Sequence, residues 1–272
     1  MTTTKPPRPP EGDWMGTPYL RFERKDGYAL LTIDRPHKYN ALTGAMYFGI
    51  RYAINVVEQD PALGGLLITG TGDYFAPGGD LGKDPEDWWT DFNLLGTDIT
   101  PFRAVREATK PVVCAVNGVA HGGGMQIAML ADVSVASDKA TFRAPELLRG
   151  IADVWYGQIL PRQVGPARAR DILMTGRTLT AAEAVDWGVV ARLVPHEKLM
   201  DEAVEVLKAC IRCAPNARQE VKRVMDDFYG NPRTAEFNAS CYSAEMAEGF
   251  RAFKERRSPN WVPEGMRVKG RL

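Results

Sequence analysis

The chain has 272 residues, and its 34 lysine and arginine residues balance 34 aspartate and glutamate residues, so the formal net charge is zero. This balance argues against a surface for binding nucleic acid, and no apolar run approaches the length of a membrane span. A content of 44% hydrophobic and 25% charged residues is typical of a globular protein. The length suits one large domain, alone or with an appendage.

The amino terminus and the cysteines indicate the compartment. Met1–Pro10 contains four prolines and no hydrophobic segment, which predicts a disordered tail over residues 1–17 and not a secretory signal. Cys210 and Cys213 form a C-x-x-C pair, a pattern found in redox and metal sites. No second pair or histidine cluster follows at metal spacing, so we expect packed thiols in a cytoplasmic protein and no metal site.

Strands and helices alternate along the first part of the chain, which indicates a layered α/β core with parallel strands. In chain order we expect a strand at 28–33, a loop at 34–42, a helix at about 44–59 capped by Thr43, strands at 64–69 and 112–116, a helix at 125–130 and a strand at 132–136. From Leu199 onward the pattern is wholly helical, and its apolar residues would leave an exposed stripe on a monomer.

A glycine run follows the buried strand at 112–116. Gly122, Gly123 and Gly124 open the apolar helix, and glycines there let a ligand approach the backbone. The first N–H groups of a helix have no partner inside it, and the helix dipole adds positive potential, so negative charge is favoured. A tight strand-to-helix corner with glycines for packing only explains this stretch alone about equally well.

A second glycine corner lies in Asp73–Lys83, where Gly78 and Gly79 follow another buried strand. Two such corners can each direct one backbone N–H into a common cleft. An enzyme that forms an enolate needs this pair, because donors must already face the oxygen on which charge develops. Losing one such donor typically costs roughly 3–4 kcal/mol of barrier.

Further motifs accompany the two corners in a set order: Arg35-Pro36 with Asn40–Leu42, Phe75–Leu81, Lys110–Val112, Ala140–Phe142 with Pro145-Glu146, Leu160–Arg162, Thr175–Arg177, Gly188–Val190 and Glu248-Gly249. In this order and spacing the chain resembles the enoyl-CoA hydratase/isomerase (crotonase) family over nearly its whole length. The resemblance implies a ββα spiral core over residues 18–198. It also implies a helical oligomerisation region over residues 199–272 that forms trimers, or hexamers as dimers of trimers.

The resemblance assigns the two oxyanion donors to the N–H groups of Gly79 and Gly123. Family hydratases hold a water molecule with two glutamates, whose positions here are occupied by Gln126 and Glu146. An amide orients a water molecule or a carbonyl but takes up no proton at neutral pH. Double-bond isomerisation with Glu146 as the base is therefore favoured over hydration.

Asp153 lies seven residues beyond Glu146, in a stretch similar to that of dienoyl-CoA isomerases but one residue shorter. In those enzymes the two carboxyl groups relay protons, which requires environments that separate their pKa values. The alternatives are an Asp153 that only caps the next helix and a Glu146 on the surface. His121 is a secondary candidate as an auxiliary acid or base, with a histidine packed under the loop as its alternative.

The resemblance implies that coenzyme A enters as part of the substrate and that no other cofactor is needed. Phe75, Ala76 and Gly78 would contact the adenine, and Arg35, Lys38 or Lys83 the phosphates. Lys254 would reach the coenzyme A of an adjacent subunit, or would lie on a solvated helix end.

Two aromatic stretches would shape the acyl pocket. The segment 85–100, which includes Trp88, is either an active-site lid or a docked surface helix. Trp155 and Tyr156 replace a glycine-rich stretch of the family and would narrow the pocket.

Two other functions remain open from the sequence. One is a family carbon–carbon bond hydrolase acting on a β-diketone or cyclic ketone, with His121 or Asp153 taking part. The other is a coenzyme A-binding scaffold without catalytic activity.

Overall fold

The computed structural model describes residues 13–80, 100–268 and 270. Its larger sheet has the strand order β1-β2-β3-β5-β7-β10. All neighbours in it are parallel except β1 and β2, which form an antiparallel pair. The strands are β1 (Leu20–Lys25), β2 (Tyr28–Ile33), β3 (Leu66–Gly70), β5 (Val112–Val116), β7 (Val133–Ser137) and β10 (Arg192–Val194).

A smaller sheet has the order β4-β6-β8-β9. It consists of β4 (Tyr74–Ala76), β6 (Val119–His121), β8 (Thr141–Arg143) and β9 (Leu179–Thr180). In the chain, β4 follows β3, β6 follows β5 and β8 follows β7, so each turn places one strand in each sheet. Successive turns stack in parallel, which is the ββα spiral that the motifs implied.

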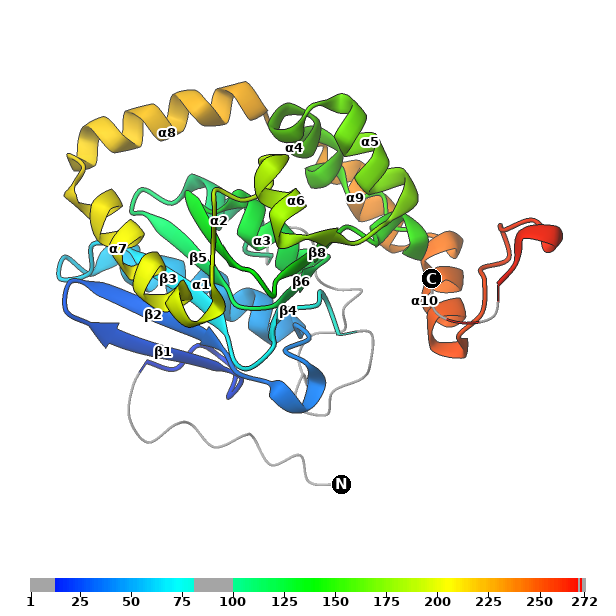
Figure 1. Cartoon of the computed structure of the whole chain (residues 1–272), viewed down its shortest axis with the longest axis horizontal. Coiled ribbons are helices and arrows are strands. Elements are labelled where there is room, and N and C mark those ends of the chain that lie inside the picture. The colour runs from blue at the N-terminus through cyan, green and yellow to red at the C-terminus, as the bar shows by residue number, and fades with distance from the viewer. Residues whose placement is uncertain (1–12, 81–99, 269, 271–272) are drawn as a thin grey trace.

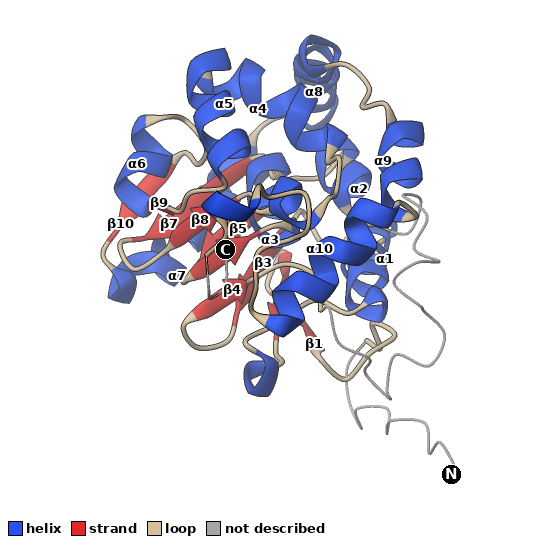
Figure 2. Cartoon of the chain, turned by 90° about the vertical axis from the view of Figure 1, so that its right-hand side faces the viewer, coloured by secondary structure: helices blue, strands red, loops and turns tan. Residues whose placement is uncertain are grey.

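Helices surround the two sheets (Figures 1 and 2). They are α1 (Gly44–Gln59), α2 (Phe102–Glu107), α3 (Gly123–Leu130), α4 (Val154–Val164), α5 (Pro166–Thr175), α6 (Ala181–Asp186), α7 (Leu199–Arg212), α8 (Pro215–Tyr229), α9 (Thr234–Cys241) and α10 (Ala244–Glu255). Short 3-10 turns are η1 (Pro36–Lys38), η3 (Glu146–Arg149), η4 (His196–Lys198) and η5 (Glu264–Met266). No helix of the described residues is both long and apolar enough to cross a membrane.

Two hydrophobic clusters cover the two faces of the larger sheet. The alternation of side chains along a strand sends Leu67 and Val113 to one face, where they pack under α7 with Leu207. Leu66, Ile68 and the facing residues of β5 point the other way into the main core, which α1, α3 and α4 complete. The glycine corners after β4 and β6 therefore adjoin this packed core.

The structure confirms several local expectations and corrects others. Thr43 caps α1, since its side chain accepts a hydrogen bond from the Met46 N–H. The predicted tail extended too far, because Met15 and Thr17 are buried. The carboxy-terminal region is not wholly helical, since after α10 the chain runs in turns with one short 3-10 helix. The predicted lid segment 85–100, with Trp88, lies outside the described residues apart from Thr100, and so does the predicted phosphate ligand Lys83.

Candidate active site

The two glycine corners meet. Gly78 has φ +103° and Gly122 has φ +51°, values that favour glycine. A Cβ on Gly122 would lie 3.5 Å from the Gly78 Cα, and a Cβ on Gly78 would lie 3.7 Å from the Gly123 nitrogen. Glycine at these positions lets two segments that are distant in sequence pack backbone against backbone.

The first corner is held by the loop after β2. The Leu42 N–H donates to the Gly78 carbonyl oxygen (2.9 Å), and the Asp80 N–H donates to the Leu42 carbonyl oxygen (2.8 Å). Arg35 Nη1 bonds Asp80 Oδ2 (2.9 Å) and the Ala41 carbonyl oxygen (3.0 Å). Its side chain is 0% exposed, so Arg35 braces this corner. The phosphate-binding role predicted for it is wrong.

The N–H groups of Gly79 and Gly123 have no acceptor among the described residues. The Gly122 carbonyl oxygen, by contrast, accepts from the Tyr156 hydroxyl (2.7 Å) and from the Gln126 N–H (3.0 Å). Because a trans peptide points its carbonyl and its N–H in opposite directions, these bonds direct the Gly123 N–H away from Tyr156. The corner therefore presents a free donor.

Glu146 lies on η3, beside the second corner. Its Oε1 would be 2.9 Å from a Cβ on Gly122, and its Oε2 is shielded from solvent with no hydrogen-bond partner among the described residues. Burial, and then the nearby Asp153, raise the pKa of Glu146 well above its usual range. The residue is half-buried, so the surface alternative is wrong. An unpaired buried carboxyl group is costly for a fold and calls for an explanation.

Asp153 combines both of its predicted interpretations. It caps α4 by accepting from the Tyr156 N–H (3.1 Å), and it lies close to Gln126, whose Nε2 is 3.4 Å from Asp153 Oδ1. Burial raises the pKa of Asp153 to about 6, while hydrogen bonds from the Tyr156 and Trp155 N–H groups hold it down. Gln126 is buried on α3. The amide and the two carboxyl groups therefore share one buried region with the glycine corners.

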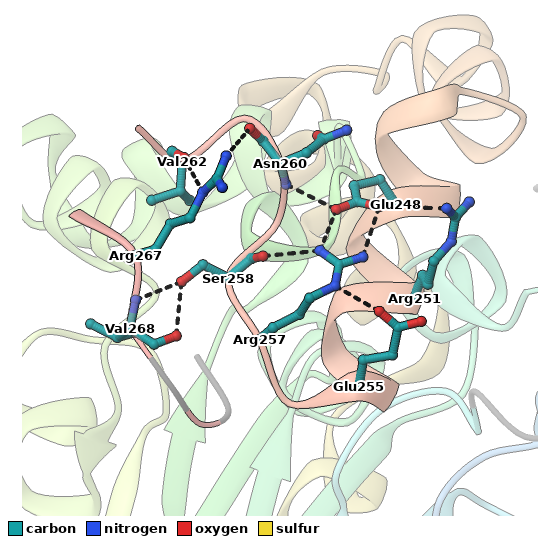
Figure 3. Close-up of polar contacts among 9 residues, drawn as sticks. All are labelled: Glu248, Arg251, Glu255, Arg257, Ser258, Asn260, Val262, Arg267 and Val268. Atoms are coloured by element: carbon teal, nitrogen blue, oxygen red, sulfur yellow. Dashed lines mark hydrogen bonds and ion pairs between the residues drawn. The ribbon is translucent and has the colours of Figure 1, made fainter. Parts of the chain in front are cut away.

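Helix α10 supports the turn that carries Glu146. A Cβ on Gly249 would collide with the Arg149 backbone, and one on Gly150 with the Glu245 backbone, so η3 and α10 touch directly. Figure 3 shows how the following segment braces α10: Arg257 bonds both oxygens of Glu248 (2.6 and 3.1 Å), and the Asn260 N–H donates to the same carboxylate (2.9 Å). The segment after α10 thus supports Glu146 indirectly, because it holds α10 and α10 packs against η3.

Of the remaining predicted residues, four are buried or half-buried and two are exposed. Phe75 and Ala76 are fully buried in β4, and Trp155 is buried in the core with its Nε1 unpaired among the described residues. His121 is held by Thr141, with 3.2 Å between its Nε2 and the Thr141 Oγ1, and burial followed by Arg143 lowers its pKa to about 4. It is therefore neutral at physiological pH. Lys38 is exposed on η1, and Lys254 is exposed on α10.

Sequence reasoning missed one residue and misjudged another. Tyr47 on α1 was not considered, yet its hydroxyl lies against Gly123. Tyr156 was predicted only as a pocket wall, although it also bonds the glycine corner. The one available signal was Tyr47's place in the first turn of the helix after Asn40–Leu42.

Comparisons with known proteins agree with the geometry. A model of the enoyl-CoA hydratase/isomerase family matches residues 23–264. The chain is 34% identical over 255 residues to a carnitinyl-CoA dehydratase of Salmonella arizonae, covering 89% of this chain and 97% of that protein. It is 37% identical over 254 residues to a mevalonyl-coenzyme A hydratase of Aspergillus fumigatus, covering 86% and 91%. A solved carnitinyl-CoA dehydratase from Mycobacterium avium superposes with a TM-score of 0.75 at 32% identity, covering 91% of this chain and 100% of that one.

The chain therefore belongs to the enoyl-CoA hydratase/isomerase family. Its architecture is the crotonase fold that the motifs implied.

Proposed function

We propose that this protein is an enzyme that acts on an acyl-CoA thioester through an enolate. The N–H groups of Gly79 and Gly123 bind the thioester oxygen, and Glu146 moves a proton at the adjacent carbon. Donors already directed at the developing charge supply the largest share of such catalysis. Coenzyme A enters with the substrate, and no further cofactor takes part in this scheme.

One observation carries the proposal. Among the described residues, Glu146 Oε2 is buried and unpaired, and the N–H groups of Gly79 and Gly123 at the two glycine corners lack acceptors. A fold that keeps an unpaired carboxyl group against free amides loses stability there, and a ligand carrying an oxygen and an acidic C–H bond would satisfy all three groups. Trp155 and Tyr156, both buried, would wall the acyl side.

Double-bond isomerisation is the reaction that we favour. Gln126 stands at the first hydratase position and bonds Asp153, so the site offers Glu146 and Asp153 as its proton-transfer groups. Glu146 removes a proton from one carbon, and either carboxyl group returns a proton to another, so the net change is a shifted double bond. The enzyme gains one proton and gives one up in each turnover. Where Asp153 is the donor, a proton then passes from Glu146 to Asp153 and restores the starting state.

Hydration or dehydration is the second candidate. It is supported by the names of the relatives, a carnitinyl-CoA dehydratase and a mevalonyl-coenzyme A hydratase. In this reaction Gln126 would orient the water molecule while Glu146 takes its proton.

A panel of 2-enoyl-, 3-enoyl- and dienoyl-CoA thioesters separates the two candidates. We expect wild-type protein to interconvert 3-enoyl and 2-enoyl isomers faster than it adds water. Glu146→Gln should abolish turnover, and the exposed Glu205→Gln should not. Water addition as the fastest reaction would contradict isomerisation but support the enolate scheme. Binding of every thioester without turnover would favour the scaffold alternative.

We also propose that copies of the chain assemble through α8 into a trimer, or into a hexamer of two trimers. Val221, Val224, Met225 and Phe228 are 56–69% exposed and lie on one face of the helix, at the spacing of an amphipathic stripe. A stripe of this kind on a single chain marks a partner surface. Light scattering should give three or six copies for wild-type protein and fewer for Val224→Asp with Phe228→Asp.

A further inference from the structure

Tyr47 places a phenol hydroxyl at the second glycine corner. It belongs to the first turn of α1, where its N–H donates to the Thr43 carbonyl oxygen (3.0 Å). Its ring packs edge-on against Phe102, with 5.9 Å between centroids, and Phe102 in turn packs against Trp155. The side chain is 4% exposed. The helix cap and the two rings therefore fix the direction of the hydroxyl.

That hydroxyl faces Gly123. A Cβ on Gly123 would collide with the Tyr47 Oη and would lie 3.0 and 3.2 Å from two ring carbons. In a helix the Cα–Cβ bond tilts toward the amino terminus, and the free N–H groups of the first turn point to the same end. The Tyr47 hydroxyl thus contacts Gly123 at the amino-terminal end of α3, the end at which the free N–H groups lie.

The Tyr47 hydroxyl has no hydrogen-bond partner among the described residues. A buried tyrosine hydroxyl usually has a hydrogen-bond partner. The Tyr47 hydroxyl, like Glu146 Oε2, is therefore available to bind a ligand. Burial, with Glu146 and Asp153 nearby, raises the pKa of Tyr47 far above its usual value. The phenol therefore stays protonated and serves as a fixed donor, not as a base.

We propose that the Tyr47 hydroxyl is a third hydrogen-bond donor to the substrate's thioester oxygen, beside the N–H groups of Gly79 and Gly123. This inference rests on the proposed function. It makes Tyr47 a catalytic residue that touches the reacting atoms, and it explains why position 123 has space only for glycine. No bond forms or breaks at Tyr47, since its proton is shared with the oxygen and returns to the phenol.

The test uses butyryl-CoA labelled with carbon-13 at the thioester carbonyl. Infrared spectra of the bound label report how strongly donors polarise the carbonyl, and deuterium uptake at the α-carbon from heavy water reports enolate formation. Tyr47→Phe keeps the ring and removes the donor. The matched control is Tyr52→Phe, an exposed tyrosine on the same helix.

We expect the wild-type carbonyl band to move to lower frequency on binding, and to move less in Tyr47→Phe. Deuterium uptake should slow by roughly 10²-fold, the usual loss for one oxyanion donor, with little change in affinity. A melting temperature equal to or above that of wild type is expected, because an unpaired buried hydroxyl is removed.

The other outcomes separate the two claims. Equal band shifts and equal uptake in wild type and Tyr47→Phe would overturn the role of Tyr47 and leave the proposed function standing. A strong fall in melting temperature would show a structural role and would also overturn it. A wild-type band that does not move would contradict the proposed function itself, and the role of Tyr47 with it.

Discussion

The Tyr156 hydroxyl donates a 2.7 Å hydrogen bond to the carbonyl oxygen of Gly122. The two residues are 34 positions apart, and their bond joins the start of α4 to the start of α3. A donor on a peptide carbonyl also polarises the peptide and strengthens its N–H as a donor. Tyr156 therefore both orients and strengthens the Gly123 N–H through the peptide that joins Gly122 and Gly123.

Tyr156→Phe should lower kcat by about 10-fold, less than the 10²–10³ expected for a direct donor, with KM nearly unchanged. The carbonyl band of bound labelled butyryl-CoA should shift less than in wild type, a change that lost packing alone would not produce. Tyr52→Phe, a change at an exposed tyrosine of α1, is the control. An unchanged band with reduced stability would mean that the hydrogen bond serves only the fold.

The pH dependence of the reaction follows from the carboxyl pair. Glu146 acts as a base only when ionised, and burial and Asp153 raise its pKa well above the usual range. Activity should therefore fall with decreasing pH from a point well above the ordinary carboxyl value of about 4.3. Asp153→Asn removes the like charge, so the acid limb of kcat/KM should move to lower pH, whereas the exposed Asp186→Asn should leave it in place. An unmoved limb in Asp153→Asn would show that the two groups do not interact.

Glu146 should destabilise the folded protein at neutral pH. Because its folded pKa is raised, the folded state binds more protons than the unfolded state above about pH 4.3, and stability falls as pH rises through that window. Glu146→Gln should therefore melt a few degrees above wild type at pH 8, since 1 kcal/mol corresponds to roughly 2–4 °C at this size. The difference should shrink toward pH 4. Scanning calorimetry at both pH values measures it, and a variant less stable at pH 8 would contradict the account.

The pKa of Glu248 is shifted in the opposite direction from that of Glu146. Arg257 lowers its pKa to about 2, so its contribution to stability is present at neutral pH and is lost as pH falls from about 4.3 toward 2. Glu248→Gln should speed amide deuterium exchange several-fold across residues 258–268 at pH 7. The control is Glu264→Gln, a change in the same segment outside the network of Figure 3. Equal exchange in both variants would mean that Arg257 does not hold the segment.

The sequence predicted the elements whose signals are local. The apolar β-branched run of β5 and the Thr43 cap of α1 are each predicted by the residues of the element itself, and both are confirmed. The strands of the smaller sheet are only two or three residues long, and pairing with distant partners defines them. β1 was missed for a related reason, since its edge position leaves several residues exposed.

The site shows the same division. The glycine pattern led to both corners, and the family resemblance led to Glu146 and Asp153, which the fold brings together. Arg35 was assigned to phosphate from the family resemblance, and its burial beside Asp80, 45 residues away, is evident only in the fold. Tyr47 and Tyr156 face glycine peptides in other turns of the spiral, and no pattern in their own neighbourhoods indicates those contacts.

The central claim is that Glu146 removes a proton from the carbon next to a thioester carbonyl held at Gly79 and Gly123. Mass spectrometry of butyryl-CoA incubated with the protein in heavy water tests this most directly. The account predicts deuterium at the α-carbon with wild-type protein and none above background with Glu146→Gln. Undiminished exchange in Glu146→Gln, or none in wild-type protein that demonstrably binds the thioester, would contradict it.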